Sequence, residues 1–342
     1  MTPHRLEAPP AGWDLLLERD PNASPTHRPE VWAALAAALP GMRPCFIAAE
    51  EDGRMRGGAP VLIERRAGMH WLHALPFLLP GTPLAEPGAH RAVDAAVAEG
   101  LASLQRELGA VGGEWALYRP QGPPLDPAAA ARVSGENRMF ETAVIDLDQG
   151  LEPVRRRMNR KTRQELGRAR ANGLTFGEEP GVLADAYALH LSQSRGWSWN
   201  RPPPLELLRR LMHSTAAGVS PVARLFTVRD ARGLLTAALV LDHRHESMVW
   251  WSGSHRDARE RHAFGFLLWS IAEWAQRAGR ARLNLGASGG SEAVWAFKRA
   301  LGATGQRYPV RWLDARHATP VGRLAAGIQA RLRRGRVRGE PA

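Results

Sequence analysis

The stretch Arg224–Ser254, RLFTVRDARGLLTAALVLDHRHESMVWWSGS, decides the fold. It contains three apolar runs, which are separated by polar turn residues at Asp230–Gly233 and at His243–Glu246. Apolar runs of this length between turn residues are typical of β-strands. The stretch therefore predicts three consecutive strands of a mainly antiparallel sheet.

The residues that follow continue the pattern of an α/β domain. Phe264–Ala278 is predicted to be a helix, because five apolar residues fall on one helical stripe: Leu267, Leu268, Ile271, Trp274 and Ala275. A strand, a helix and a strand are predicted next, at Ala281–Leu285, Glu292–Leu301 and Tyr308–Leu313. Two helices are predicted before the three strands, at Leu183–Arg195 and Pro204–Ala216.

The first half of the chain repeats this order. A helix is predicted first, then three strands, a helix and a strand, at Pro29–Leu39, Cys45–Phe77, His90–Leu108 and Glu114–Tyr118. A duplicated α/β unit is the simplest account, with a boundary near residues 120–150. We expect domains at 1–140 and 141–320, followed by a basic helix and tail at 321–342.

Composition and charge narrow the possible classes of protein. The chain has 342 residues and one cysteine, Cys45, so an internal disulfide framework is excluded. No apolar run is long enough for a membrane span, and the N-terminus does not have the pattern of a signal peptide. We therefore expect a soluble, cytoplasmic protein.

The charge is divided unevenly between the two halves. Residues 1–150 carry 13 arginines and 19 acidic residues, whereas residues 151–342 carry 33 basic and 15 acidic residues. An excess of this kind indicates an anionic partner for the second half. Nucleic acid, nucleotide cofactors and anionic lipid are all compatible with it.

Three segments of the second half carry a resemblance to a known family. They are RRRMNRKTRQELGRARANG at Arg155–Gly173, WWSGSHRDARERHAFGFLLWSIAEWAQRAGRARLNLGASGG at Trp250–Gly290, and VWAFKRALGA at Val294–Ala303. Their order resembles the FemAB-like branch of the GNAT acyltransferase superfamily. The resemblance implies two tandem GNAT-like domains, of which the first is degenerate, each with a mixed, mainly antiparallel sheet flanked by helices.

The resemblance also implies an enzyme that transfers an acyl group to an amine. Relatives use acyl-CoA, such as acetyl-CoA, which is the first donor we expect for this N-acyltransferase. FemAB members use aminoacyl-tRNA and a cell-wall precursor as acceptor, and this alternative stays open. A non-catalytic protein that binds nucleic acid or a membrane surface is a third possibility, since it explains the charge.

Lys298 is the leading candidate for catalysis. It is one of only two lysines, against 44 arginines, and a lysine is a compact point charge whereas an arginine is a planar fork. The resemblance places the Phe-Lys pair of FemAB-like enzymes at Phe297 and Lys298, where the lysine is thought to stabilise developing negative charge. Tyr308 is a further candidate, as a general acid.

Two groups of residues are candidates for binding phosphates. Arg156, Arg160, Lys161 and Arg163 lie on a helix predicted from about Glu152 to Ala171, which carries eight basic and two acidic residues. A solvated helix face is the alternative interpretation. Arg259, Arg261 and Gly265 follow the central strand, where GNAT proteins bind the donor pyrophosphate, although the glycine-rich pattern of that loop is absent.

The remaining candidates lie at the ends of the two central strands. Trp251 and Ser252 are expected beside the donor, with the alternative that both tryptophans of the pair pack in the core. Gly286 and Ser288 end the next strand and are candidates for the acceptor or anion site, or for a simple turn. The histidines are dispersed, and we assign no metal.

Overall fold

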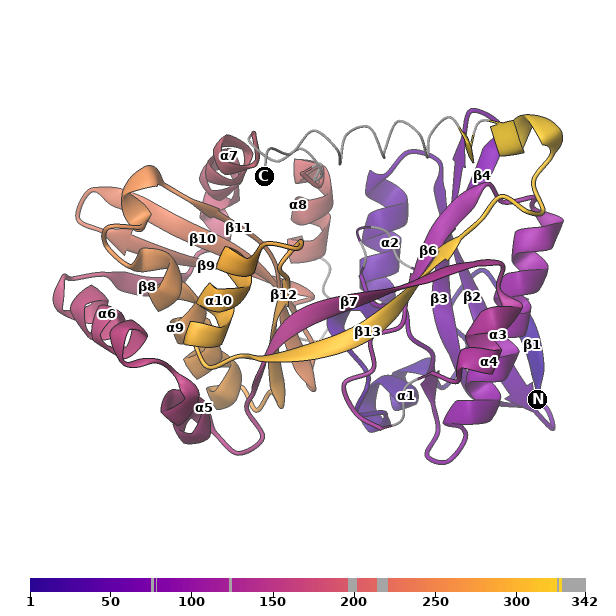
Figure 1. The fold of residues 1–342 in the computed structure, drawn as a ribbon, viewed down its shortest axis with the longest axis horizontal. Coiled ribbons are helices and arrows are strands. Elements are labelled where there is room, and N and C mark those ends of the chain that lie inside the picture. Colours follow the sequence, from indigo (N-terminus) through magenta and orange to yellow (C-terminus); the bar gives the residue numbers. More distant parts are fainter. Residues whose placement is uncertain are drawn as a thin grey trace. The chain divides into compact units, whose positions relative to one another are not determined.

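The computed structural model describes residues 1–74, 77, 79–122, 125–195, 202–213, 221–324 and 326–327. The chain divides into two compact units, the first formed by residues 1–140 and 307–342 and the second by residues 141–306. Each unit is a sheet flanked by helices, as the ribbon shows (Figure 1). The predicted α/β class, with mixed and mainly antiparallel sheets, is confirmed.

The sheet of the second unit has the strand order β7-β12-β11-β10-β9-β8. The strands are β7 (Gly135–Asp146), β8 (Thr175–Glu178), β9 (Ala223–Asp230), β10 (Gly233–Asp242), β11 (Glu246–Ser254) and β12 (Arg282–Ala287). All neighbouring strands are antiparallel except β11 and β12, which are parallel. The three strands predicted from the opening stretch are thus β9, β10 and β11.

Helices cover both faces of this sheet. They are α5 (Leu151–Arg157), α6 (Arg160–Ala171), α7 (Leu183–Ser194), α8 (Leu205–His213), α9 (Ala263–Arg277) and α10 (Glu292–Ala300). The apolar stripe predicted for α9 is largely buried, since Leu267 and Ile271 are 0% exposed and form one cluster with β10 and β12. β10 is buried from Leu235 to Asp242, because side chains on both of its faces are covered.

The sheet of the first unit has the order β1-β2-β3-β4-β6-β13, and β5 pairs with β3. The strands are β1 (Thr2–Leu6), β2 (Met42–Glu51), β3 (Arg54–Arg66), β4 (Met69–His73), β5 (Leu84–Ala85), β6 (Gly112–Ala116) and β13 (Thr304–Leu313). The helices are α1 (Trp13–Arg19), α2 (Pro29–Ala38), α3 (His90–Glu107) and α4 (Pro127–Arg132). As in the second unit, one neighbouring pair, β4 with β6, is parallel.

Alternate side chains of β2 build two cores in the first unit. Ile47 belongs to the cluster that includes α3, and a side chain at Gly100 of α3 would collide with it. Phe46 contacts Trp13 and Trp32, with ring centroids 4.7 and 5.7 Å away. The period-two alternation of the strand therefore buries both faces of the sheet.

Each unit takes its last strand from the other half of the sequence. Val310–Leu313 of β13 pair with Gly113–Ala116 of β6, whereas Thr142–Asp146 of β7 pair with residues of β12. In a simple repeat, β7 would have completed the first sheet and β13 the second. The chain from Arg307 onward therefore groups with the first unit, which differs from the domain expected at 141–320.

One predicted helix differs from the structure, and another lies largely outside the described residues. The single helix expected from Glu152 to Ala171 is two helices, α5 and α6, because Asn159 has an extended conformation and its side chain accepts the Thr162 N–H as an N-cap. The basic helix and tail expected at 321–342 falls largely outside the described residues. Within the described part of the chain, no helix is long and apolar enough to cross a membrane.

Candidate active site

The two parallel strands of the second unit separate part of the way along their length. β11 and β12 pair only at Glu246–Met248 with Arg282–Asn284. Beyond this point the two strands do not pair with each other. We call the unpaired segments, Val249–Ser254 of β11 and Leu285–Ala287 of β12, the open ends. Backbone N–H and C=O groups along the open ends are freed from the ladder and can bind a ligand.

Irregularities in both neighbouring ladders accompany this separation. The register of β10 with β11 shifts so that Trp250 is an extra residue between Val249 and Trp251. The register of β12 with β7 shifts between Asn284 and Ala287. Bulges of this kind bend a strand and increase its twist, so the two strands diverge.

Lys298 lies beside the open end of β12. It is the one buried residue of α10 among the described residues, at 8% exposure. Its Nζ donates to the carbonyl oxygens of Gly286, at 2.8 Å, and of Ala287, at 2.9 Å. Burial lowers the pKa of Lys298 to about 8, and within the described part of the chain no carboxylate forms an ion pair with it.

The neighbours of Lys298 link α10 to the start of α9. Phe297 is half-buried, and its ring stacks on Phe264 with centroids 5.6 Å apart. Gly265, in the first turn of α9, also faces this ring, because a Cβ there would lie 3.9 Å from Phe297. The structure thus brings together Lys298, Phe297, Gly265 and Gly286.

The predicted donor loop has mixed features. Arg259 is exposed, whereas Arg261 forms an ion pair with Asp230. The pKa of the Asp230 carboxyl is lowered, mainly by the hydrogen bond from the backbone N–H of Arg232 and to a smaller extent by the charge of Arg261. His262 begins α9 with a φ of 58° and no side-chain cap. The first-turn N–H groups of α9 are therefore not capped by the preceding side chain, and a helix N-terminus of this kind favours an anion.

Trp251 and Ser252 lie on the open end of β11 and contact α7. The ring of Trp251 packs on His190, with centroids 4.9 Å apart, and the Ser252 carbonyl accepts a hydrogen bond from His190 Nδ1 at 2.7 Å. Trp251 is buried, at 6% exposure, whereas its neighbour Trp250 is half-buried. His190 was not found from sequence, because a single histidine on a helix gives no pattern.

The four basic candidates on α5 and α6 are exposed. Arg156 and Lys161 form loose i,i+4 pairs with Glu152 and Glu165, at 3.6 and 3.8 Å. Arg163 instead donates to backbone carbonyls at the break between the two helices, so it has a structural role besides its charge. Arg160 is exposed at the start of α6.

Tyr308 and Ser288 have different surroundings. Tyr308 belongs to the first unit, where its ring packs edge-on against Tyr118 at 5.5 Å, and burial raises its pKa to about 12. Ser288 follows β12, and its buried hydroxyl has no hydrogen-bond partner within the described residues. A polar atom of this kind beside the open ends is available to a ligand.

The first unit closes the position that is open in the second. Past the end of β4, the segment Leu79–Ala85 takes the place beside β6. The Gly81 N–H in this segment donates to the Ala116 carbonyl of β6 at 3.1 Å. Trp115 Nε1 in turn donates to the Gly81 carbonyl at 3.1 Å. The parallel pair of the first unit therefore has no open end of this kind at β6.

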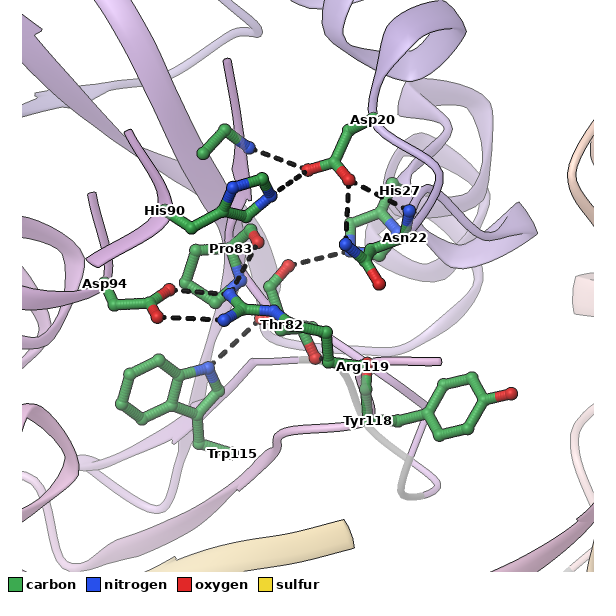
Figure 2. Close-up of polar contacts among 12 residues, drawn as sticks. Asp20, Asn22, His27, Thr82, Pro83, His90, Asp94, Trp115, Tyr118 and Arg119 are labelled. Atoms are coloured by element: carbon green, nitrogen blue, oxygen red, sulfur yellow. Dashed lines mark hydrogen bonds and ion pairs between the residues drawn. The ribbon is translucent and has the colours of Figure 1, made fainter. Parts of the chain in front are cut away.

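A buried polar network holds this segment in place (Figure 2). Asp20 accepts a hydrogen bond from the Ala85 N–H. His27 is hydrogen-bonded to the carbonyl of Thr82, and Arg119 donates to the carbonyl of Pro83. Arg119 also forms a two-pronged ion pair with Asp94, at 2.7 and 3.0 Å. These partners satisfy one another, so the network is structural.

The sheet of the second unit, with its parallel pair that opens part of the way along, agrees with a GNAT fold. The acetyltransferase (GNAT) domain family matches residues 154–299, which span α5 to α10. Most of the second unit therefore matches a GNAT acetyltransferase domain. No curated protein matches the sequence.

Solved structures resemble nearly the whole chain. FemX superposes with a TM-score of 0.67 at 11% identity, over 90% of this chain and 96% of FemX. A tandem GNAT protein from the clavulanic acid biosynthesis pathway has a TM-score of 0.51 at 16% identity, over 92% and 98% of the two chains. A GNAT-family acetyltransferase from Colwellia psychrerythraea has a TM-score of 0.50 at 9% identity, over 92% and 100%. At these identities the likeness concerns the fold.

Within the described residues, no group of three or more histidine, cysteine, aspartate or glutamate side chains is arranged to hold a metal ion. Four buried polar residues that the sequence did not single out lie on the paired part of β11 and β12 and on the adjacent strand β7: Thr142, Glu246, Arg282 and Asn284. The sequence feature that could have pointed to them is Asn284, a polar residue inside the otherwise apolar strand segment LNLGA.

Proposed function

We propose that the second unit transfers an acyl group from an acyl-CoA thioester to an amine at the open ends of β11 and β12. The observation that supports this most directly is the position of Lys298. A buried ammonium, held by the carbonyls of Gly286 and Ala287, lies where the two strands have separated. The GNAT domain family of this unit agrees with acyl transfer.

The chemistry of the reaction assigns a task to the ammonium. The amine attacks the thioester carbonyl carbon, so a C–N bond forms, negative charge develops on the oxygen, and the C–S bond then breaks. The amine loses a proton, and the thiolate that leaves takes one up. A lysine has three N–H donors, and two of those of Lys298 are used by carbonyls. The third is available to the developing oxyanion.

The donor phosphates would be held at the start of α9. The first-turn N–H groups of this helix and the exposed guanidinium of Arg259 are the groups available there. Arg261 is already paired with Asp230, and the glycine-rich loop is absent. We therefore assign the phosphates to a helix terminus and one arginine, with the free backbone of the open ends binding the chain of the donor.

A second candidate donor is aminoacyl-tRNA, with a cell-wall precursor as the amine acceptor, as the resemblance to the FemAB branch implies. The specific observation in its favour is the surface of α5 and α6. Seven arginines and Lys161 are exposed on these two helices, with only Glu152 and Glu165 as acidic residues. A surface of this kind is suited to a polyphosphate backbone.

Titration calorimetry of the purified chain distinguishes these donors. The ligands are acetyl-CoA, a longer acyl-CoA and bulk charged tRNA in one buffer, with Lys298→Ala measured alongside. Saturable binding of one thioester, followed by transfer to an amine that Lys298→Ala loses, is the expected result. Binding and transfer from charged tRNA alone would favour the second donor. Absence of transfer from either donor would overturn the proposal.

A further inference from the structure

Asn284 connects three strands at the point where β11 and β12 separate. It is the last residue of β12 that pairs with β11, and it is 2% exposed. Its Oδ1 accepts the hydroxyl of Thr142 at 2.6 Å, from β7, and the N–H of Gly286 at 2.8 Å. Its Nδ2 donates to Oε1 of Glu246 at 3.3 Å, from β11.

The bond to Gly286 replaces a lost ladder contact. Gly286 has a φ of 76°, a left-handed conformation that favours glycine, and it lies within the register break between β12 and β7. A short amide side chain that accepts the N–H two residues further on stabilises a turn of this kind. Asn284 thus fixes the direction in which β12 leaves the sheet.

The same peptide segment holds Lys298. The N–H of Gly286 is bound by Asn284, and the carbonyls of Gly286 and Ala287 both accept from Lys298 Nζ. The position of the ammonium therefore depends on the turn, and the turn depends on Asn284. Rotation of this turn would move both acceptors of the ammonium together.

A buried carboxylate orients the amide of Asn284. Glu246 is 0% exposed, and its Oε2 accepts from Nε of Arg282 at 3.3 Å. Because a carboxylate only accepts, it faces the NH₂ group of Asn284 and directs the amide oxygen toward Thr142 and Gly286. An aspartate at position 284 would place a second carboxylate against Glu246.

We infer that Asn284 is a positioning residue for acyl transfer, which holds the Gly286 turn and so fixes the ammonium of Lys298 beside the open ends. This inference rests on the proposed function and adds to it a residue that does not touch the substrate. The hydrogen bond from the amide of Asn284 to the carboxylate of Glu246 makes it testable, because donor and acceptor can be exchanged between the two positions.

The test compares Asn284→Ala, Asn284→Asp and the double variant Asn284→Asp/Glu246→Gln in steady-state transfer assays. Both single variants are expected to lower kcat at least tenfold, with the KM for the donor changed less than threefold. In the double variant the new glutamine amide donates to the new aspartate, so kcat is expected to return to within threefold of the wild type. Asn137→Asp, the same change at an exposed asparagine of β7, is the matched control and is expected to change neither constant.

Hydrogen exchange of the Gly286 amide gives a readout that does not need activity. Faster exchange is expected in Asn284→Ala and protection close to wild type in the double variant. Unchanged kcat in folded Asn284→Asp, or unchanged exchange at Gly286 in Asn284→Ala, would overturn the inference. If the wild type transfers no acyl group, the proposed function fails, and the exchange measurement still decides whether Asn284 holds the turn.

Discussion

The ring of Phe264 stacks on the ring of Phe297, with centroids 5.6 Å apart and an angle of 17° between their planes. This contact joins the first turn of α9 to α10, whose inner side carries Lys298. The stack therefore joins the N-terminus of α9, which we assign to the donor phosphates, to α10, which carries the ammonium. Both rings are half-buried and pack against the core cluster of the second unit.

Loss of this stack is expected to affect stability and catalysis together. Phe264→Ala should lower the free energy of unfolding by about 1–3 kcal/mol, less than for a fully buried aromatic residue, because the ring is only half-buried. It should also lower kcat/KM, since α10 is less firmly held. Denaturant unfolding and a transfer assay measure the two effects. Val294→Ala, at an exposed position of α10, is the control and should change stability by less than about 0.5 kcal/mol. Equal effects of both substitutions would contradict this role.

The lowered pKa of Lys298 predicts two opposite responses to pH. If the ammonium stabilises the oxyanion, kcat should fall as the pH rises through about 8, where the folded protein loses this proton. The unfolded chain keeps the proton to about 10.5, so between these values the unfolded state binds more protons, and folding stability should rise with pH relative to Lys298→Met.

The two responses are measured by pH–rate profiles and by unfolding of the wild type and Lys298→Met across pH 7–11. Lys161→Met removes an exposed lysine of α6 and should leave both profiles unchanged. A rate profile without a limb near pH 8 in the wild type would argue against a role for the charged form.

The ion pair of Arg119 with Asp94 is expected to stabilise the first unit. Both side chains are nearly inaccessible, at 2% and 3% exposure, so Asp94→Ala leaves an uncompensated guanidinium in the interior. Breaking a buried pair in this way costs about 3–5 kcal/mol. Glu99→Ala, which removes the partner of the exposed Arg132, should cost less than about 1 kcal/mol. Unfolding curves of the two variants provide the comparison, and similar midpoints would show that the network in Figure 2 does not hold the segment.

Local patterns predicted much of the fold. The three strands in Arg224–Ser254 and the stripe of α9 are set by neighbouring residues, so period and turn residues suffice. β7 was missed because its first half, around Arg138, is polar and its flanks are rich in turn residues. The pairing of β13 with β6 joins residues 194 to 200 positions apart, which periodicity does not encode.

The candidate site was predicted only in part. Lys298 was singled out because a lysine is rare in this chain; the structure buries it beside Gly286 and Ala287, and its catalytic role stays a prediction. Asn284 was not found, because its importance comes from Thr142 and Glu246, which are distant in the sequence. Asn159 ended the predicted long helix because a capping side chain competes locally with helix continuation, a signal that the charge pattern obscured.

The exposed cations of α5 and α6 allow the two donors to be separated by charge reversal. We expect that changing Arg156, Arg160 and Lys161 to glutamate leaves the binding of an acyl-CoA within about twofold, because the first turn of α9 and Arg259 supply the proposed phosphate site. The same variant should bind RNA at least tenfold more weakly, and its salt dependence should be shallower by about three phosphate contacts. Arg163 is left unchanged, because it bonds the carbonyls at the helix break. Fluorescence titrations at several salt concentrations measure both affinities. A parallel loss of acyl-CoA binding would place the donor phosphates on α5 and α6 instead, and it would require the assignment to α9 to be withdrawn.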